Sequence, residues 1–346
     1  MDRKRKEEAP VPLYFQLIRE MRRNMLGKLK PGEMIPSERL LCRQFKVSRI
    51  TVRKALEQLT VNGEIYKLHG KGTFKSFNQT NEIRELVYVI CCTSMITSPG
   101  RETVIRALAE TAEKRGYHLV IRGYHSSGGL DSLRDFATRD VNGGLIVSVQ
   151  ELTNADILSL QQTRIPCVFM NQEKGYSVCA DYDAAGRLAA QWAKRRNFRR
   201  VALFLPSRKL HDIRQYLKGF REESDPRNCS AKIYETHYSR SLAAETARSL
   251  LAKGAFHPDA FICGDDLEAA GAADALKEAG LSGKISVCGV NNSYLASENG
   301  FSSIDLKLEE RSRKAASLLA DILEGKAPAS PYTLKIQPEF VERKIK

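Results

Sequence analysis

The chain has 346 residues, of which 55 are Lys or Arg and 41 are Asp or Glu, for a formal net charge of +14. A chain of this length can form two or three domains, each with a core of its own. The longest strongly apolar run, residues 86–92, is too short to cross a bilayer, and charged residues rather than an apolar segment follow Met1. We therefore expect neither a membrane span nor a secretory signal.

The positive charge is concentrated near the N-terminus. Residues 1–80 hold 18 Lys and Arg against 8 Asp and Glu, whereas the remaining residues hold 37 against 33. A basic small domain joined to a nearly neutral larger one predicts a part that binds phosphates and a body with another task.

The eight cysteines show no C-x-x-C pair and no Cys/His spacing typical of a metal site. Several lie in apolar runs such as 87–92 and 260–263, where a reduced thiol behaves as a small hydrophobic group. We therefore expect buried thiols in a reducing cytoplasm, with no metal and no cofactor.

Residues 36–61 have the pattern of two helices joined by a tight turn. Pro36 followed by Ser37 predicts a helix start with a serine cap, and Lys46–Ser48 predicts the turn. Ser48 then caps a second helix that runs to about Val61. The residues expected to face the core are Leu40, Leu41 and Phe45 on the first helix and Val52, Ala55, Leu56 and Leu59 on the second.

A basic hairpin is predicted after the second helix. Residues 65–68 alternate as a strand does, and residues 69–74 supply a turn and a return strand. Gly70 and Gly72 allow the backbone to approach a phosphate closely, and Lys71 supplies charge. Because the N-terminal end of a recognition helix enters the major groove, this order of elements predicts binding to duplex DNA.

These residues resemble the winged helix-turn-helix of GntR-type transcription regulators. The shared pattern is a Pro-Ser-Glu-Arg start, a Val-Ser-Arg-x-Thr-Val-Arg recognition helix and a Gly-x-Gly-Thr-Phe wing. Ile50 and Cys42 stand where the family more often has polar and small residues, and Ile50 suits contact with a thymine methyl, which leaves the operator sequence open. The resemblance implies DNA contacts at Arg39, Arg49, Thr51 and Arg53 on the helices and at His69, Gly70 and Lys71 in the wing.

Beyond a polar linker, short apolar strands alternate with amphipathic helices, which predicts parallel sheets covered on both faces. Two runs of similar size predict two doubly wound lobes with a cleft between them. The first run has expected strands at 86–92, 117–122, 144–149 and 166–170 and helices at 102–115, 130–139 and 153–162. The second has expected helices at 184–196, 211–223, 242–253 and 267–280 and strands at 200–205, 231–235, 259–263 and 285–290.

Ligands of open α/β sheets bind beyond the carboxyl ends of the strands. The side chains at or near these positions are hydroxyls, amides, a carboxylate and an arginine, a set that suits a polyhydroxylated ligand because each hydroxyl both donates and accepts. The candidate effector contacts are Ser94, Tyr124, Ser148, Asn171, Arg214, Asp265 and Asn291.

Residues 86–346 resemble the effector domain of LacI/GalR-type regulators, which is related to periplasmic sugar-binding proteins. The resemblance lies in residues 143–147, 165–169, 181–189, 199–203, 264–271 and 287–292. It implies a two-lobed domain with chain crossovers expected near 198, 292 and 325, and effector contacts at Arg214, Asp265 and Asn291. Asp265 stands where the family usually has Asn, and Asn291 stands where it usually has Asp.

Residues 1–77 as a GntR-type head, 78–85 as a linker and 86–346 as a LacI-type body match the arrangement of arabinose-repressor-like regulators. The resemblance implies a cytoplasmic homodimeric repressor that binds double-stranded operator DNA and responds to a small sugar, a monosaccharide, with no membrane partner. An activator role, a purine or sugar-phosphate effector, and an enzyme that processes its ligand remain open alternatives.

Overall fold

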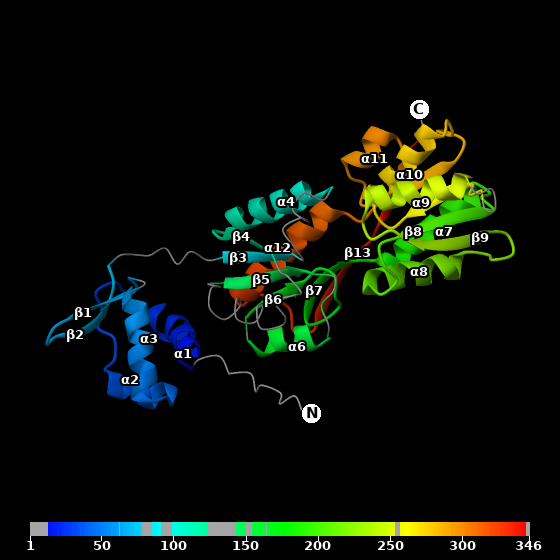
Figure 1. Cartoon of the computed structure of the whole chain (residues 1–346). Helices are drawn as coiled ribbons and strands as arrows, with labels where there is room; N and C mark the ends of the chain where they lie inside the picture. Colours follow the sequence, from blue (N-terminus) through cyan, green and yellow to red (C-terminus); the bar gives the residue numbers. More distant parts are fainter. Residues whose placement is uncertain are drawn as a thin grey trace, which may run out of the picture. The chain divides into compact units, whose positions relative to one another are not determined.

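A computed structural model of the chain describes residues 13–61, 63–77, 85–90, 99–123, 143–149, 152, 154–163, 165–252 and 257–343. These residues divide into two units, 13–77 and 85–343, which we call the head and the body (Figure 1). The predicted helix at 130–139 and the predicted contacts Ser94 and Tyr124 lie outside the described residues.

The head packs its helices around one apolar core and ends in a two-stranded hairpin. Its elements are α1 (Leu13–Met21), the π-helical turn η1 (Arg22–Leu26), α2 (Glu38–Phe45), α3 (Arg49–Val61), β1 (Ile65–Leu68) and β2 (Gly72–Lys75). The buried side chains of this core include Leu17, Met21, Leu41, Val52, Ala55, Leu56, Leu59 and Ile65. The inward-facing residues predicted for the second helix are therefore confirmed.

The two predicted helices are confirmed in the head, with one correction to their buried face. The Ser37 hydroxyl accepts a hydrogen bond from Leu40 N at 3.4 Å, so it caps α2 as expected. Leu41 is fully buried and Phe45 is half-buried, but Leu40 is 51% exposed. Successive residues of a helix are about 100° apart around its axis, so the face that buries Leu41 cannot also bury Leu40.

Lobe 1 of the body is a six-stranded parallel sheet with the order β13-β7-β6-β5-β3-β4. Figure 1 shows α4 and α12 on one face of this sheet and α6 on the other. The strands are β3 (Glu85–Ile90), β4 (His118–Gly123), β5 (Gly143–Ser148), β6 (Cys167–Phe169), β7 (Tyr176–Ala180) and β13 (Tyr332–Ile336), and the helices are α4 (Arg101–Lys114), α6 (Asn154–Gln162) and α12 (Leu308–Leu323).

Lobe 2 is a second six-stranded sheet with the order β14-β12-β11-β10-β8-β9. Its strands are parallel except β14, which runs antiparallel to β12, so the predicted parallel sheet is confirmed apart from this edge strand. The strands are β8 (Arg200–Leu205), β9 (Ser230–Glu235), β10 (Ala260–Cys263), β11 (Ser286–Val290), β12 (Ser302–Asp305) and β14 (Glu339–Val341), and the helices are α7 (Tyr182–Arg195), α8 (His211–Glu223), α9 (Arg240–Ala252), α10 (Asp266–Glu278) and α11 (Tyr294–Asn299).

The chain passes between the lobes at three points that differ from those expected near 198, 292 and 325. β7 and β13 belong to lobe 1, while α7 and β14 belong to lobe 2, so two passages lie at Asp181 and at residues 337–338. The third lies at residues 306–307, between β12 of lobe 2 and α12 of lobe 1. Gln337 Nε2 donates to Asp181 Oδ2 at 3.1 Å, which ties two of the passages together.

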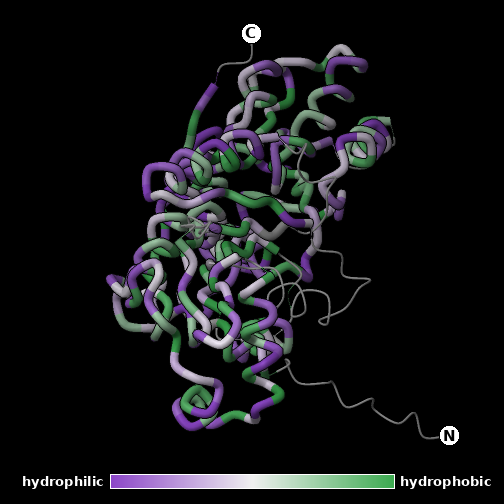
Figure 2. Tube along the Cα trace, turned by 90° about the vertical axis from the view of Figure 1, so that its left-hand side faces the viewer, coloured by the Kyte–Doolittle hydropathy of each residue, from purple (hydrophilic) through white to green (hydrophobic). Residues whose placement is uncertain are grey.

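The cores of the lobes are apolar and closely packed. Figure 2 shows hydrophobic stretches of the chain in the interior, with hydrophilic stretches between them. Helices α7 and α8 approach so closely that a Cβ atom added at Gly186 would lie 1.9 Å from the Tyr216 carbonyl oxygen, so the contact requires glycine. Of the described cysteines, Cys179, Cys263 and Cys288 are buried, as expected, whereas Cys42, Cys167 and Cys229 are half-buried.

Candidate DNA-binding face and effector cleft

The N-terminal end of α3 presents a pair of exposed arginines. Arg49 and Arg53 lie one turn apart, with side chains 70% and 56% exposed, and the Nε atoms of both donate to Glu38 Oε2 at 3.0 and 3.1 Å. Partial burial of Glu38 acts to raise its pKa, but the hydrogen bonds from the two guanidinium groups outweigh this effect and lower the pKa. Glu38 is therefore ionised at neutral pH and holds both arginines on the outer face of α3.

The turn between α2 and α3 sets the position of Thr51. The Ser48 hydroxyl accepts a hydrogen bond from Thr51 N at 3.2 Å and lies 2.8 Å from the Thr51 hydroxyl. Ile50 and Arg39 are exposed. The four predicted contacts on the helices, Arg39, Arg49, Thr51 and Arg53, thus belong to the exposed end of a helix-turn-helix.

The wing is a tight hairpin whose exposed tip is basic. Lys71 N donates to the Leu68 carbonyl at 3.0 Å, and His69, Gly70 and Lys71 are all exposed. Gly70 has φ +72° and Gly72 has φ +119°, a region that favours glycine, so both turn positions fit their residues. Lys75 Nζ donates to the Leu26 and Leu29 carbonyls at 2.7 and 2.8 Å, which fixes the return strand to the end of η1.

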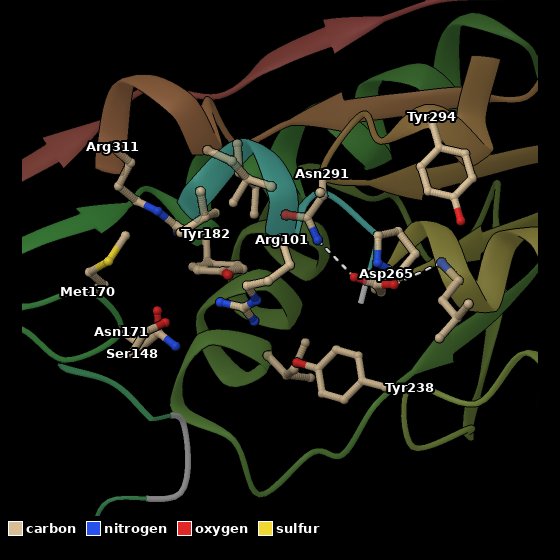
Figure 3. Close-up of a pocket in the computed structure, with 18 of the residues that line it drawn as sticks. Arg101, Ser148, Met170, Asn171, Tyr182, Tyr238, Asp265, Asn291, Tyr294 and Arg311 are labelled. Carbon is tan, nitrogen blue, oxygen red and sulfur yellow. Dashed lines mark hydrogen bonds between the residues drawn. The ribbon is translucent and has the colours of Figure 1, made fainter. Parts of the chain in front are cut away.

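The body contains a cavity of about 510 Å³ that is lined by residues of both lobes, a volume within the usual range for small-molecule sites. Ser148 lies at the end of β5 and Asn171 follows β6, while Asp265 follows β10 and Asn291 follows β11. Figure 3 shows Ser148 and Asn171 on one side of the cavity and Asp265 and Asn291 on the other. Four predicted contacts are thus brought together beyond the carboxyl ends of their strands.

Asp265 and Asn291 form a direct pair in the cavity wall. Asn291 Nδ2 donates to Asp265 Oδ2 at 2.8 Å, and Leu267 N donates to Asp265 Oδ1 at 2.8 Å, which caps α10. Burial raises the pKa of Asp265, and these two hydrogen bonds and the charge of Arg101 oppose the rise. An amide and a carboxylate thus form a hydrogen-bonded pair at these two positions.

Arg214 does not line this cavity. Its guanidinium donates to the Lys209 carbonyl and lines a second, more open depression of about 970 Å³, which shares His237 and Tyr238 with the first. Ile213, one residue earlier on α8, does line the cavity. Because the next residue is turned by about 100° around the helix, Arg214 points elsewhere.

The cavity is also lined by tyrosines and arginines that the strand-end argument does not find. Arg101 opens α4, donates from Nη1 to the Tyr88 hydroxyl and lies 5.9 Å from the centroid of the Tyr88 ring. Tyr182 opens α7, and burial raises the pKa of its phenol while the charge of Arg311 acts to lower it. Figure 3 shows Arg101 and Tyr182 in the middle of the cavity, with Tyr238 below them.

Arg311 is the buried arginine of this set, and the sequence does contain a signal for it. It lies on α12 between Leu308 and Ala315, which both belong to the face packed on the lobe 1 core. Charged residues of an amphipathic helix normally lie on its solvent-exposed face. An arginine on the apolar face is therefore unusual and indicates a buried guanidinium.

Within the described ranges, no group of His, Cys, Asp and Glu residues is arranged to hold a metal ion. No helix in the same part of the chain is long and apolar enough to cross a bilayer.

The head and the body each match a known protein family. Residues 14–74 match the bacterial regulatory proteins of the gntR family, and residues 190–344 match the periplasmic binding protein-like domain. The chain is similar to the arabinose metabolism transcriptional repressor of Geobacillus stearothermophilus, with 26% identity over 97% of this chain and 98% of that protein. The transcriptional repressor NagR of Bacillus subtilis (strain 168) is 41% identical over 71 residues, which are 20% of this chain and 29% of NagR.

The fold of the chain is also similar to that of a solved regulator structure. The complex of the transcriptional regulator CelR with cellobiose superimposes with a TM-score of 0.66 and 18% sequence identity, over 98% of this chain and 100% of that one. The chain thus combines a GntR-type DNA-binding domain with a periplasmic-binding-protein-like domain.

Proposed function

We propose that this chain, a GntR-type head joined to a periplasmic-binding-protein-like body, is a transcription repressor controlled by a small sugar. The observation that carries the proposal is the presence in one chain of two features: an exposed Arg49–Arg53 pair on a helix-turn-helix, and a cavity of about 510 Å³ lined by two lobes. Two relatives, the arabinose metabolism transcriptional repressor and NagR, are named as repressors, which supports the repressor role. The cellobiose bound to CelR supports a sugar as ligand.

In this proposal the head contacts both the bases and the sugar-phosphate backbone of DNA. Arg39, Arg49, Thr51 and Arg53 contact the major groove, where arginine pairs with guanine and threonine contacts base edges or phosphates. His69, Gly70 and Lys71 in the wing contact the sugar-phosphate backbone, because their exposed backbone and charge suit phosphate oxygens.

The cleft binds the effector between the two lobes in this proposal. Ser148 and Asn171 of lobe 1 and Asp265 and Asn291 of lobe 2 contact its hydroxyl groups. A ligand bound to both lobes favours their closed arrangement by the difference in its affinity for the open and closed states. Arg214 lines the adjoining depression and is not part of this contact set.

Coupling between cleft and head requires a dimer and the linker. We assign residues 1–77 to the head, 78–85 to the linker and 86–346 to the body, and we place the dimeric repressor in the cytoplasm, where its operator is. Closure of the lobes then changes the separation of the two recognition helices, which must match half-sites about one helical turn apart. Replacing residues 78–84, which precede β3, by a longer Gly/Ser segment should uncouple ligand binding from DNA release, and full retained coupling would contradict this route.

The proposal is tested on a duplex selected by the full-length protein from a random library. Fluorescence anisotropy should show binding at least about 1,000-fold tighter to the selected duplex than to a scrambled one at physiological salt. A ligand of the cleft should then shift the affinity for the selected duplex by about 5- to 150-fold, the usual range of allosteric coupling. Equal affinity for both duplexes would contradict the proposal.

The relatives are named as regulators, and we propose that the chain does not process its ligand. Incubating the protein with each ligand that binds the cleft and analysing the mixture by mass spectrometry tests this point. Conversion at a rate proportional to protein concentration would make the chain an enzyme.

A further inference from the structure

We propose that the effector carries an anionic group, a carboxylate or a phosphate, and that Arg311 binds this group. The inference rests on the proposed role of the cleft as the effector site. Arg311 lies in the first turn of α12, is only 6% exposed and lines the cavity. Figure 3 shows its guanidinium directed from α12 toward Tyr182 and the interior of the cavity.

The charge of Arg311 has no ion-pair partner in the described part of the chain. Its Nε and Nη1 atoms are buried and have no hydrogen-bond partner among those residues. Arg313, two residues further along the same helix, instead pairs with Glu110 at 2.7 Å and with Glu309 at 2.8 Å. A buried charge without a partner is strongly unfavourable, so a ligand anion that reaches Arg311 gains an interaction that the protein alone leaves unmade.

The polar groups that face Arg311 do not take the place of that anion. Burial raises the pKa of both Tyr182 and Asp212, and in each case the charge of Arg311 opposes the rise. A hydrogen bond with Arg311 also lowers the pKa of Tyr182, but a neutral phenol does not neutralise the charge of the guanidinium. Asp212 is buried, and its Oδ1 accepts from Ile213 N at 2.9 Å. Asp212 belongs to a separate small depression and does not line the effector cavity, so a ligand in the cavity meets the guanidinium and not this carboxylate.

The rest of the cavity also favours an anion. Among the described residues, its lining contains two guanidinium groups, those of Arg101 and Arg311, against one carboxylate, that of Asp265. Both oxygens of Asp265 already accept hydrogen bonds from the protein, and burial raises its pKa. The adjoining depression adds the side chains of Lys174, Lys209, Arg214 and Lys335 against that of Glu173. A concave site lined by an excess of one charge attracts ligands of the opposite charge.

The two ends of the cavity therefore suit different parts of one ligand. Arg311 on α12 of lobe 1 suits a carboxylate or phosphate, because a guanidinium donates two parallel hydrogen bonds to such groups. Asp265 and Asn291 of lobe 2 suit hydroxyl groups. Figure 3 shows Arg101 and Tyr182 between these two ends. A sugar acid or a sugar phosphate has both kinds of group on one small molecule.

The first test uses inorganic phosphate as the probe and thermal unfolding of the full-length protein as the readout. Relative to chloride at the same ionic strength, phosphate at about five times its dissociation constant should raise the Tm by about 2–4 °C. Arg311→Met should lose this rise and should itself be no less stable without phosphate, since it removes an unpaired buried charge. Arg313→Met, the same change at an arginine of α12 that does not line the cavity, should keep the rise.

Two results of this titration would overturn the anion site. One is a wild-type protein whose Tm does not respond to phosphate beyond the chloride control. The other is a rise of equal size in Arg311→Met.

The second test identifies the class of effector by calorimetry with matched ligands: D-glucose, D-gluconate and D-glucose 6-phosphate, and D-ribose with D-ribose 5-phosphate. An anionic member should bind at least 10-fold more tightly than its neutral counterpart, and Arg311→Met should remove the difference. Equal or tighter binding of the neutral member would refute the assignment. If none of these sugars binds, the phosphate titration decides alone.

Binding to the selected duplex separates this inference from the proposed function. If an anionic sugar binds through Arg311 but leaves the DNA affinity unchanged, the anion site stands and the proposed function fails. If a neutral sugar releases DNA from the wild type and from Arg311→Met alike, the proposed function stands and the anion site fails.

Discussion

Replacing Arg53 by alanine should weaken binding to the selected duplex by about 5- to 150-fold and leave the fold intact. The loss corresponds to the roughly 1–3 kcal/mol that one good arginine–base contact contributes to discrimination. Arg53 is 56% exposed and lies one turn after Arg49, so we expect both to reach the same stretch of DNA from the N-terminal end of α3. Glu38 holds both side chains in place before DNA arrives, which reduces the entropy lost on binding.

The same substitution should change the stability of the head very little. The Arg53–Glu38 pair is largely exposed, and such pairs contribute about 0.2–1 kcal/mol. Glu38 also keeps its hydrogen bond to Arg49 at 3.0 Å. The effect on DNA binding is therefore expected to be several times larger than the effect on unfolding.

Anisotropy titrations at several salt concentrations, together with urea unfolding, check this prediction. Arg227→Ala is the matched control, because Arg227 is 91% exposed in lobe 2 and pairs with Asp225 at 3.3 Å outside the head. If Arg53 contacts a phosphate rather than a base, affinity should fall for selected and scrambled duplexes alike and the salt slope should drop by about one. Unchanged affinity for both duplexes, or an equal loss in Arg227→Ala, would refute the assigned role of α3.

Three further substitutions test the body. Burial raises the pKa of Glu268 from 4.5 to about 8, so the folded state keeps a proton that the unfolded chain releases. This contribution to stability is fully present below about pH 4.5 and is lost as the pH rises toward 8, at up to about 1.4 kcal/mol per pH unit. Glu268→Gln should therefore reduce the fall in the free energy of unfolding with pH, measured by urea unfolding followed by Trp192 fluorescence. An unchanged slope of that free energy against pH would contradict the buried, protonated Glu268. Gly186→Ala should destabilise lobe 2 by about 1–3 kcal/mol in the same assay, because the added Cβ meets the Tyr216 carbonyl oxygen. A loss below about 0.5 kcal/mol, as is usual for surface substitutions, would contradict the close contact. Asp265→Asn should tighten phosphate binding in calorimetry and weaken binding of neutral sugars, and the reverse order would count against a cationic cavity.

The head was largely predictable because its signals are local. Ser37 caps α2 in the sequence position where a cap is expected, and Val52, Ala55, Leu56 and Leu59 recur at helical spacing. The N-terminal helix α1 was not predicted, although Leu17 and Met21 complete the core that the later helices form. The place of α1 in the core depends on packing against residues that follow it in the chain, and no local sequence pattern predicts that contact.

The body was predictable where strand and helix follow each other in sequence. β8, α8 and β10 lie within one residue of their expected positions, because each is an apolar or amphipathic run bounded by polar residues. β7, β12, β13 and β14 were missed. Each has only three to five residues, and β13 and β14 pair with strands distant in the sequence, β7 and β12. The crossovers were misplaced for the same reason, because they are defined by which sheet each of these short strands joins.

The cleft was predictable only as far as topology determines it. The strand-end rule finds Ser148, Asn171, Asp265 and Asn291, which all line one cavity. Arg101, Tyr182 and Arg311 come from the first turns of helices, so their meeting depends on how the two lobes pack. Arg214 follows Ile213 on α8, and sequence spacing alone did not show which of the two faces the cavity.

The most direct test of the account is the affinity of the full-length protein for its selected duplex, measured by anisotropy with and without a ligand that calorimetry shows to bind the cleft. The account predicts a 5- to 150-fold change on saturation, about 1–3 kcal/mol of coupling, and no such change for a scrambled duplex. A cleft ligand that leaves the affinity for the selected duplex unchanged would contradict it.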